Sequence, residues 1–198
     1  MPLEVISYIM ASQNRKQRMQ FEIIIQCAPF LKGIKTASIM NIDKRWIREL
    51  YEMIEDTDIS CHILVTRKDR CLVLFYREKE LTRVLADRDV WEFLKEYGYE
   101  DDSLAMILTR LSMRMNLYSK GEIRFPHEIG VFLDYPLEDV KAFIEKGGRD
   151  YLFNGYWKVY HDPEWAQLTF LAYDKAKDSA VNEFLIGKSI REIAKMSA

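Results

Sequence analysis

The chain has 198 residues, of which 48% are hydrophobic, so it is long enough to bury a substantial core. Its 29 Lys and Arg residues nearly balance 31 Asp and Glu residues, which gives a formal net charge of −2. This balance, without a long run of like charges, argues against nucleic-acid and anionic-membrane partners. We expect a single domain over residues 1–198, with residues 1–14 as an N-terminal extension.

The N-terminus and the cysteines favour a cytoplasmic protein. The segment Met1–Ile6 lacks the basic start and the apolar run of a signal peptide, and no later segment is apolar for long enough to cross a bilayer. Cys27, Cys61 and Cys71 are an odd number without a CxxC spacing. This pattern argues against a disulfide framework and a cysteine zinc site, so we expect three reduced thiols.

The first part of the chain predicts two helices, a strand and a further helix. A weak helix over Leu3–Met10 precedes a helix over Arg15–Cys27, which Pro29 should end because proline cannot continue the hydrogen-bond ladder. A glycine-containing loop then leads to a short strand over Thr36–Met40. Asp43 is a typical N-cap for the helix that follows.

Two apolar runs that meet at residues 68–69 predict the clearest β-hairpin in the chain. With the turn at these residues, Val65 faces Leu72 and Ile63 faces Leu74. Both faces of the hairpin are apolar, so we expect helices to cover both.

The remaining segments predict more helices and one more strand. These segments are helices over Glu78–Ala86, Asp89–Tyr97 and Ser103–Leu117, a strand over Tyr156–Tyr160, and a long helix capped by Asp162. The strand should join the sheet. The predicted fold class is α+β, with a small, mostly antiparallel sheet of three or four strands covered by helices.

Residues 125–144 predict two short helices that meet at a sharp corner. Pro126 suits the start of the first helix, and Pro136 cannot continue it. Gly130 allows a neighbouring group to come close, and Asp134 should adopt a left-handed conformation at the turn. This spacing is typical of a helix-turn-helix.

A helix-turn-helix shape does not by itself imply DNA binding. The outward side of the second helix should present Leu137, Glu138, Lys141, Ala142 and Glu145. Such a surface is about as negative as positive, whereas binding in a DNA groove needs Arg and Lys against phosphates. We therefore favour a corner that packs inside the protein and braces the sheet.

Four motifs carry a family resemblance. They are Cys27–Pro29 with Gly33–Ser38, Phe125–Leu133, Tyr135–Val140 and Gly155–Tyr160. With these motifs in this order, the chain resembles an uncharacterised clostridial family, domain of unknown function 3793, along most of its length. The resemblance implies a bacterial protein, and it implies no activity or cofactor because the family has none established. Asp134 stands where the family usually has glycine, so the turn should be slightly strained, and replacing Asp134 by glycine should stabilise the fold by up to about 1 kcal/mol.

Six polar side chains of these motifs form the candidate ligand-binding site: Cys27, Lys35, His127, Glu128, Lys158 and Tyr160. Together they suit an anionic small molecule or a soft metal cofactor, and His127 and Glu128 can exchange protons. Each also has a structural alternative. Cys27 and Lys35 flank what can be a plain connecting loop, His127 and Glu128 can serve the start of a helix, and Lys158 can extend to solvent between two rings.

Known catalytic motifs do not fit the chain. His127 and Glu128 resemble the start of HExxH, but Val131 replaces the second histidine, which excludes a zincin site. A nucleophile elbow and a dinucleotide fingerprint are also missing. We assign no metal-ligating residues.

Three hypotheses follow for the function. The first is a cytoplasmic binding or adaptor protein with a small-molecule or protein partner site. The second is a small enzyme that uses His127 or Cys27, which predicts that these side chains lie within ~4 Å of each other or share a pocket. The third is a DNA-binding regulator that uses residues 126–146, which predicts an exposed corner bordered by Arg and Lys.

Overall fold

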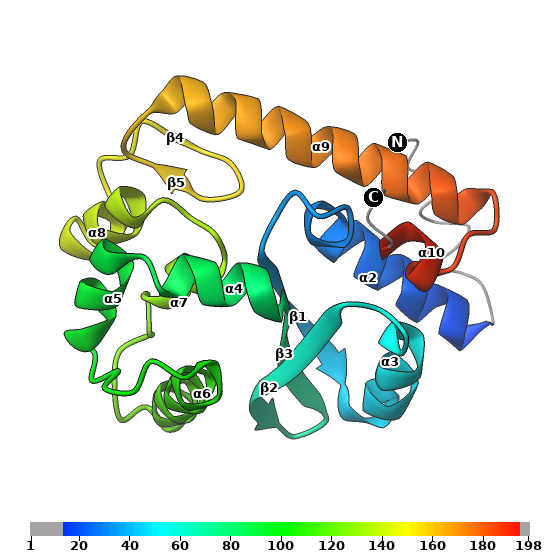
Figure 1. Ribbon diagram of the computed structural model, residues 1–198, viewed down its shortest axis with the longest axis horizontal. Helices are drawn as coiled ribbons and strands as arrows, with labels where there is room; N and C mark the ends of the chain where they lie inside the picture. Colours follow the sequence, from blue (N-terminus) through cyan, green and yellow to red (C-terminus); the bar gives the residue numbers. More distant parts are fainter. Residues whose placement is uncertain (1–13, 195–198) are drawn as a thin grey trace.

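The computed structural model describes residues 14–194 and confirms the α+β class (Figure 1). The helix expected over Leu3–Met10 lies outside the described residues, as does nearly all of the predicted N-terminal extension. Within residues 14–194, no helix combines the length and the apolarity needed to span a bilayer.

A three-stranded antiparallel sheet lies at the centre of the molecule. Its strands are β1 (Ala37–Asp43), β2 (Ile59–Arg67) and β3 (Arg70–Arg77), in the order β1-β3-β2. The strand predicted over Thr36–Met40 is therefore confirmed as β1, which continues three residues further, to Asp43. In the register of the β1–β3 pair, Ala37 lies opposite Tyr76.

The register of the β2–β3 hairpin is partly as predicted. Val65 pairs with Leu72, but Ile63 pairs with Val73 and not with Leu74, because a β-bulge shifts the register between Ile63 and Val65. The bulge places Leu64 and Val65 against the same hydrophobic cluster. In a regular strand, adjacent side chains point to opposite faces. The bulge therefore lets both side chains bury apolar area on one face, and it does so by making the strand irregular at one residue.

One face of the sheet is covered by helices from both ends of the chain. These are α2 (Arg15–Leu31), α3 (Ile47–Ile54) after a 3₁₀ turn (Lys44–Trp46), α9 (Pro163–Leu185) and α10 (Ile190–Ala194). Asp43 accepts a hydrogen bond from the Arg45 backbone N–H, so it caps the 3₁₀ turn. The cluster beneath these helices includes Phe21, Phe75 and Phe184.

The prediction that Pro29 ends α2 is wrong. The helix continues to Leu31 with Pro29 inside it. Proline removes one hydrogen bond, at a cost of roughly 3 kcal/mol. The last turn buries Phe30 and Leu31, which are 0% and 2% exposed, and burial of two such side chains offsets that cost.

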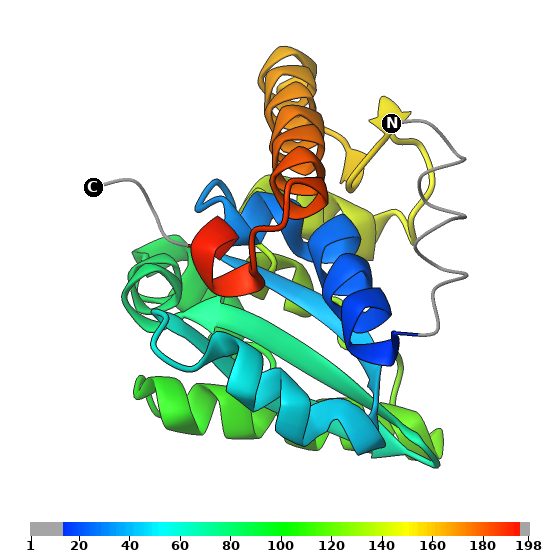
Figure 2. The same cartoon turned by 90° about the vertical axis from the view of Figure 1, so that its right-hand side faces the viewer.

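The other face of the sheet is covered by five helices from the middle of the chain. They are α4 (Glu78–Leu85), α5 (Arg88–Lys95), α6 (Leu104–Lys120), α7 (Ile129–Phe132) and α8 (Leu137–Glu145). Figure 2 shows the sheet between α2 on one side and α6 on the other. Helices therefore cover both faces, as the apolar hairpin predicted.

The strand predicted over Tyr156–Tyr160 does not join the sheet. Only Lys158–Val159 form a strand (β5), and it pairs with Phe153–Asn154 (β4) in a separate hairpin. Directly after β5, the N–H of Tyr160 donates to a carboxylate on α8. The β4–β5 hairpin packs on the first half of α9 (Figure 1).

Candidate functional site

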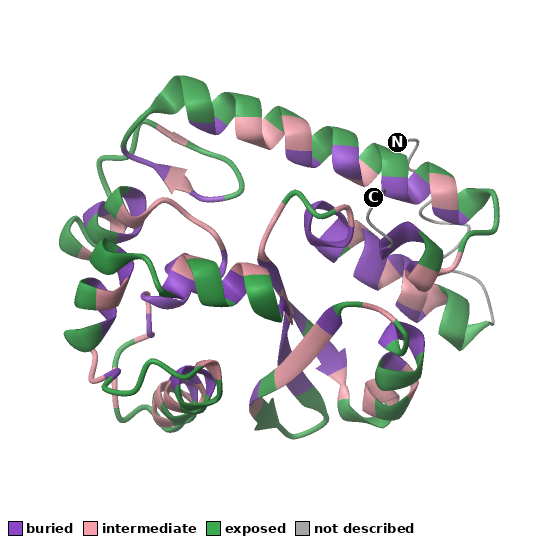
Figure 3. Cartoon of the chain, viewed as in Figure 1, coloured by how far each residue is buried: buried purple, intermediate pink, exposed green. Residues whose placement is uncertain are grey.

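The helical corner is formed by α7 and α8. All four residues of α7 are buried (Figure 3). A Cβ atom on Gly130 would lie 2.7 Å from Val140, so the glycine allows α7 and α8 to pack closely. Asp134 has a φ of 63° at the turn, which confirms the left-handed conformation expected there. The first helix of the corner is therefore buried, whereas the second, α8, exposes Glu138, Lys141 and Glu145.

Glu128 lies just before α7 and is fully buried. One of its carboxylate oxygens accepts hydrogen bonds from Arg114 and from the Tyr99 hydroxyl, the latter at 3.4 Å. Its other oxygen has no hydrogen-bond partner among the described residues. The Arg114–Glu128 ion pair joins α6 to the corner, so Glu128 connects these two parts of the structure.

Asp139 on α8 attaches the β4–β5 hairpin to the corner. Its carboxylate accepts hydrogen bonds from the Trp157 Nε1–H at 2.7 Å, the Tyr160 N–H at 2.9 Å and the His161 N–H at 2.8 Å. Asp139 and Ala142 are both buried, so the prediction that Ala142 faces outward is wrong. The hairpin covers the side of α8 that would otherwise face solvent.

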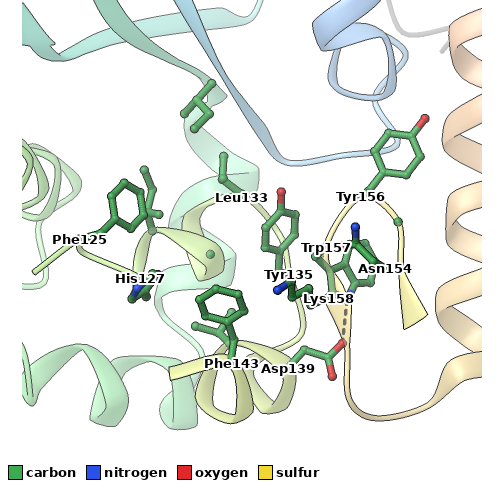
Figure 4. A pocket seen from close by; sticks show the side chains of 15 residues that line it. Phe125, His127, Leu133, Tyr135, Asp139, Phe143, Asn154, Tyr156, Trp157 and Lys158 are labelled. Carbon is green, nitrogen blue, oxygen red and sulfur yellow. Dashed lines mark hydrogen bonds between the residues drawn. The ribbon is translucent and has the colours of Figure 1, made fainter. Parts of the chain in front are cut away.

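A pocket of about 310 Å³ opens between the corner and the hairpin (Figure 4). We call it the corner pocket. Its lining is mainly apolar and comes from β1, the corner and the hairpin. The lining residues are Ile39, Phe125, His127, Ile129, Gly130, Leu133, Tyr135, Asp139, Val140, Phe143, Asn154, Gly155, Tyr156, Trp157 and Lys158.

His127 and Lys158, two of the six candidate residues, line this pocket. The His127 ring lies 5.1 Å from Phe125 and 4.9 Å from Phe143, between centroids, and burial lowers the pKa of its imidazole. The Lys158 ammonium lies 5.7 Å from the centroid of Phe143 and donates to the Gly148 carbonyl at 2.7 Å. Both side chains therefore border the same apolar space.

Four polar side chains of the lining have capacity for a further hydrogen bond. His127, Tyr135 and Asn154 form no side-chain hydrogen bond within the described part of the chain, and Lys158 has spare N–H groups. Asp139, by contrast, is occupied by its protein donors. The free polar groups of the pocket can thus all donate, Lys158 is donor-only, and no free carboxylate is among them.

Cys27 and Lys35 lie together outside the corner pocket. Burial raises the pKa of the Cys27 thiol to about 11 and lowers the pKa of the Lys35 ammonium to about 8. Lys35 lies 5.0 Å from the centroid of the Tyr135 ring, does not line the pocket, and forms no ion pair with a described carboxylate. Cys27 is inaccessible and mainly protonated at neutral pH, which does not suit a nucleophile.

Tyr160, the last candidate, is buried beside the pocket without lining it. Lys146 lies 5.2 Å from the centroid of its ring, and its hydroxyl has no hydrogen-bond partner among the described residues. The structure thus brings together His127 and Lys158, places Cys27 with Lys35, and leaves Glu128 and Tyr160 at separate positions.

Sequence reasoning missed most of the aromatic lining and the role of Asp139. Phe125, Tyr135 and Trp157 were assigned to the core or to no site, because an aromatic residue at a helical or strand position usually packs. In the strand predicted over Tyr156–Tyr160, alternation would send the neighbouring side chains of Trp157 and Lys158 to opposite faces. Trp157 lies at the hairpin turn, where strand alternation does not hold, and so both line the pocket. An acidic residue in the first turn of a helix gave no signal that Asp139 is buried.

Comparison with known proteins places the chain in a family. Residues 23–194 match the family model described as Protein of unknown function (DUF3793). The chain belongs to this family. This DUF3793 protein matches no curated protein and no solved structure with significance. The corner pocket lies wholly within the residues that the family model covers.

The corner pocket of this DUF3793 protein does not bring His127 and Cys27 together. His127 has no carboxylate or nucleophile bonded to its ring, and Cys27 does not line the pocket. Within residues 14–194, no three His, Cys, Asp or Glu side chains are arranged to hold a metal ion. What the pocket offers is an apolar surface with hydrogen-bond donors at its border.

Proposed function

We propose that this protein is a cytoplasmic binding protein and that it holds a small, mainly apolar anion in the corner pocket. The observation that carries the proposal is the combination of an aromatic lining with free donors and one ammonium group. Small-molecule sites in proteins are typically mostly apolar, with a few placed polar groups that fix orientation. Lys158 supplies the positive charge, and His127, Tyr135 and Asn154 supply further donors.

The alternatives have less support. The hypothesis of an enzyme that uses His127 or Cys27 predicts that both side chains share a pocket, and only His127 lines the corner pocket. A DNA-binding regulator needs Arg and Lys on the exposed side of α8, which instead presents Glu138, Lys141 and Glu145. A protein partner for the pocket has no support in its size, which suits a small ligand.

The test uses 1-anilinonaphthalene-8-sulfonate, an aromatic anion whose fluorescence rises in apolar surroundings. The wild-type protein should bind one equivalent. Lys158→Met should weaken binding by about tenfold, because it removes one charge-assisted interaction of roughly 1.5 kcal/mol. Its matched control is Lys141→Met, since Lys141 also lies 5.7 Å from a phenylalanine ring, that of Phe93, but outside the pocket.

The control variant should bind the probe with unchanged affinity. Equal weakening by both substitutions would mean that net charge, and not the pocket, governs binding. No saturable binding by the folded wild-type protein would overturn the proposal.

A further inference from the structure

We infer that the ligand of the corner pocket is a flat aromatic monocarboxylic acid, with one or two fused rings. The inference rests on the proposed function and specifies the chemical class of the bound molecule. It follows from three features of the pocket, which are the shape of its walls, the polarity of its free groups and the number of charges that it can balance.

Aromatic rings from both the corner and the hairpin line the pocket. The corner contributes Phe125, Tyr135 and Phe143, and the hairpin contributes Tyr156 and Trp157 (Figure 4). Tyr135 and Trp157 pack directly on each other, 5.3 Å apart between centroids with their planes 30° apart, and so form one continuous aromatic surface. A ring placed against this surface gains edge and face contacts that an alkyl chain lacks. A rigid ring also loses less conformational entropy on binding than a chain with many rotatable bonds.

The free polar groups favour an anionic acceptor, because Lys158 can only donate and the lining has no free carboxylate. His127, Asn154 and Lys158 can all donate, whereas the one carboxylate of the lining, Asp139, already accepts from the hairpin. An amine or a guanidinium ligand would find no free acid. A carboxylate matches these donors with two acceptor oxygens.

The pocket can balance one negative charge but not two. Lys158 is its one ammonium group, and it already donates to the Gly148 carbonyl just beyond the C-terminus of α8. That end of the helix is the negative end of its dipole. Burial lowers the pKa of His127, which keeps its imidazole mainly neutral at pH 7. A monocarboxylate therefore fits this site better than a phosphate monoester.

The size of the pocket sets the upper limit. A volume of about 310 Å³ lies at the small end of the range for ligand sites. One or two fused rings with a short acidic group fill such a volume. A longer hydrocarbon chain would have to fold back on itself.

The experiment is calorimetric titration of the full chain at pH 7.5 with three probes that have the same number of non-hydrogen atoms. These are 2-naphthoate, undecanoate and the neutral ketone 2-acetylnaphthalene. We expect 2-naphthoate to bind about tenfold more tightly than either of the other two. Lys158→Met should reduce its affinity to that of the ketone, and Lys141→Met should leave it unchanged.

The remaining outcomes separate this inference from the proposed function. Equal affinity for undecanoate would overturn the aromatic class, and equal affinity for the ketone would overturn the carboxylate, while an apolar ligand site would stand in both cases. If none of the three binds but 1-anilinonaphthalene-8-sulfonate does, only this inference fails. If that dye does not bind either, the proposed function fails with it. Circular dichroism of each variant checks that it is folded.

Discussion

Asp134 adopts a left-handed backbone conformation, and its side chain compensates for the strain. One carboxylate oxygen accepts hydrogen bonds from the Thr36 backbone N–H at 3.0 Å and from the Thr36 hydroxyl at 2.9 Å. These bonds tie the α2–β1 loop to the corner across 98 positions of sequence. The sequence predicted the strained turn but not the partner, because a contact this distant leaves no local pattern.

The contact reverses the expected effect of glycine at this position. Asp134→Gly relieves strain of about 1 kcal/mol but removes two hydrogen bonds to a charged group, each contributing roughly 1.5 kcal/mol or more. We predict a net loss of about 2 kcal/mol in the free energy of unfolding, measured by urea denaturation. Asp134→Asn keeps an acceptor and should lose less. A more stable glycine variant would contradict the Thr36 contact.

Lys35 and Cys27 give the protein a defined dependence of stability on pH. The pKa of Lys35 falls from 10.5 to about 8 on folding, so between these values the folded protein binds fewer protons than the unfolded chain. Stability therefore rises with pH in that window. The pKa of Cys27 rises from 9.0 to about 11, so above pH 9 the thiol acts in the opposite direction.

The interval from pH 8 to pH 9 isolates Lys35. Wild-type protein should gain up to about 1 kcal/mol in the free energy of unfolding relative to Lys35→Met across this interval. Denaturation curves of the two proteins at pH 8.0, 8.5 and 9.0 measure the difference. Lys141→Met, which alters an exposed lysine, should follow the wild type. Parallel behaviour of wild type and Lys35→Met would contradict the burial of the ammonium group.

At the scale of elements, the corner depends on the close approach of α7 and α8. Gly130→Ala places a methyl group 2.7 Å from Val140 and 3.4 Å from Tyr135. We predict a loss of about 2 kcal/mol in the free energy of unfolding, as is typical of overpacking, together with weaker probe binding because Gly130 lines the pocket.

Gly147→Ala is the matched control. Gly147 has a φ of 58°, and nothing lies within 4 Å of an added Cβ atom. Its replacement should cost only about 1 kcal/mol of backbone strain and leave probe binding unchanged. Equal losses in both variants would mean that helix packing at Gly130 is not tight.

Most elements could be predicted because their signals are local. Helical spacing, N-caps and turn residues located α3–α6, α8 and α9 to within a few residues. The errors arose where tertiary contacts override local signals. Burial of Phe30 and Leu31 extends α2 past Pro29. The Asp139 carboxylate accepts a hydrogen bond from the backbone directly after β5, which attaches this segment to α8.

The site was predictable only in part. His127 and Lys158 were selected as polar residues of the motifs that carry the family resemblance, and both line the corner pocket. The apolar residues that make the pocket were not selected, since they look like core until the corner and the hairpin are placed beside each other. Glu128 and Cys27 were selected for the same reason as His127, but they lie in the core with structural partners.

At the scale of the whole molecule, one buried arginine joins the two ends of the chain to the sheet. Arg77 is 2% exposed and donates to Asp58 at 2.8 Å, to the Phe30 carbonyl at 2.6 Å and to the Ala194 carbonyl at 3.3 Å. It therefore connects the end of α2, β3 and α10. Helix α9 runs over the top of the molecule from the hairpin to this region (Figure 1).

Arg77→Met should destabilise the protein by about 3 kcal/mol, because it leaves buried carbonyl groups without a donor. Thermal unfolding measures the effect as a lower Tm. Arg45→Met is the control, since the Arg45–Asp43 ion pair is exposed on the arginine side and its loss should change the Tm little. A loss of similar size in both variants would contradict the connecting role of Arg77.

The most direct test of the corner pocket is a nuclear magnetic resonance titration of the indole N–H signals with 1-anilinonaphthalene-8-sulfonate. The chain has four tryptophans, and the Trp157 Nε1–H donates to Asp139 at the wall of the pocket. The account predicts a saturable shift of the Trp157 signal, while the signals of Trp46 and Trp91, which lie outside the pocket, stay in place. A saturable shift of Trp46 or Trp91 with an unmoved Trp157 would contradict it.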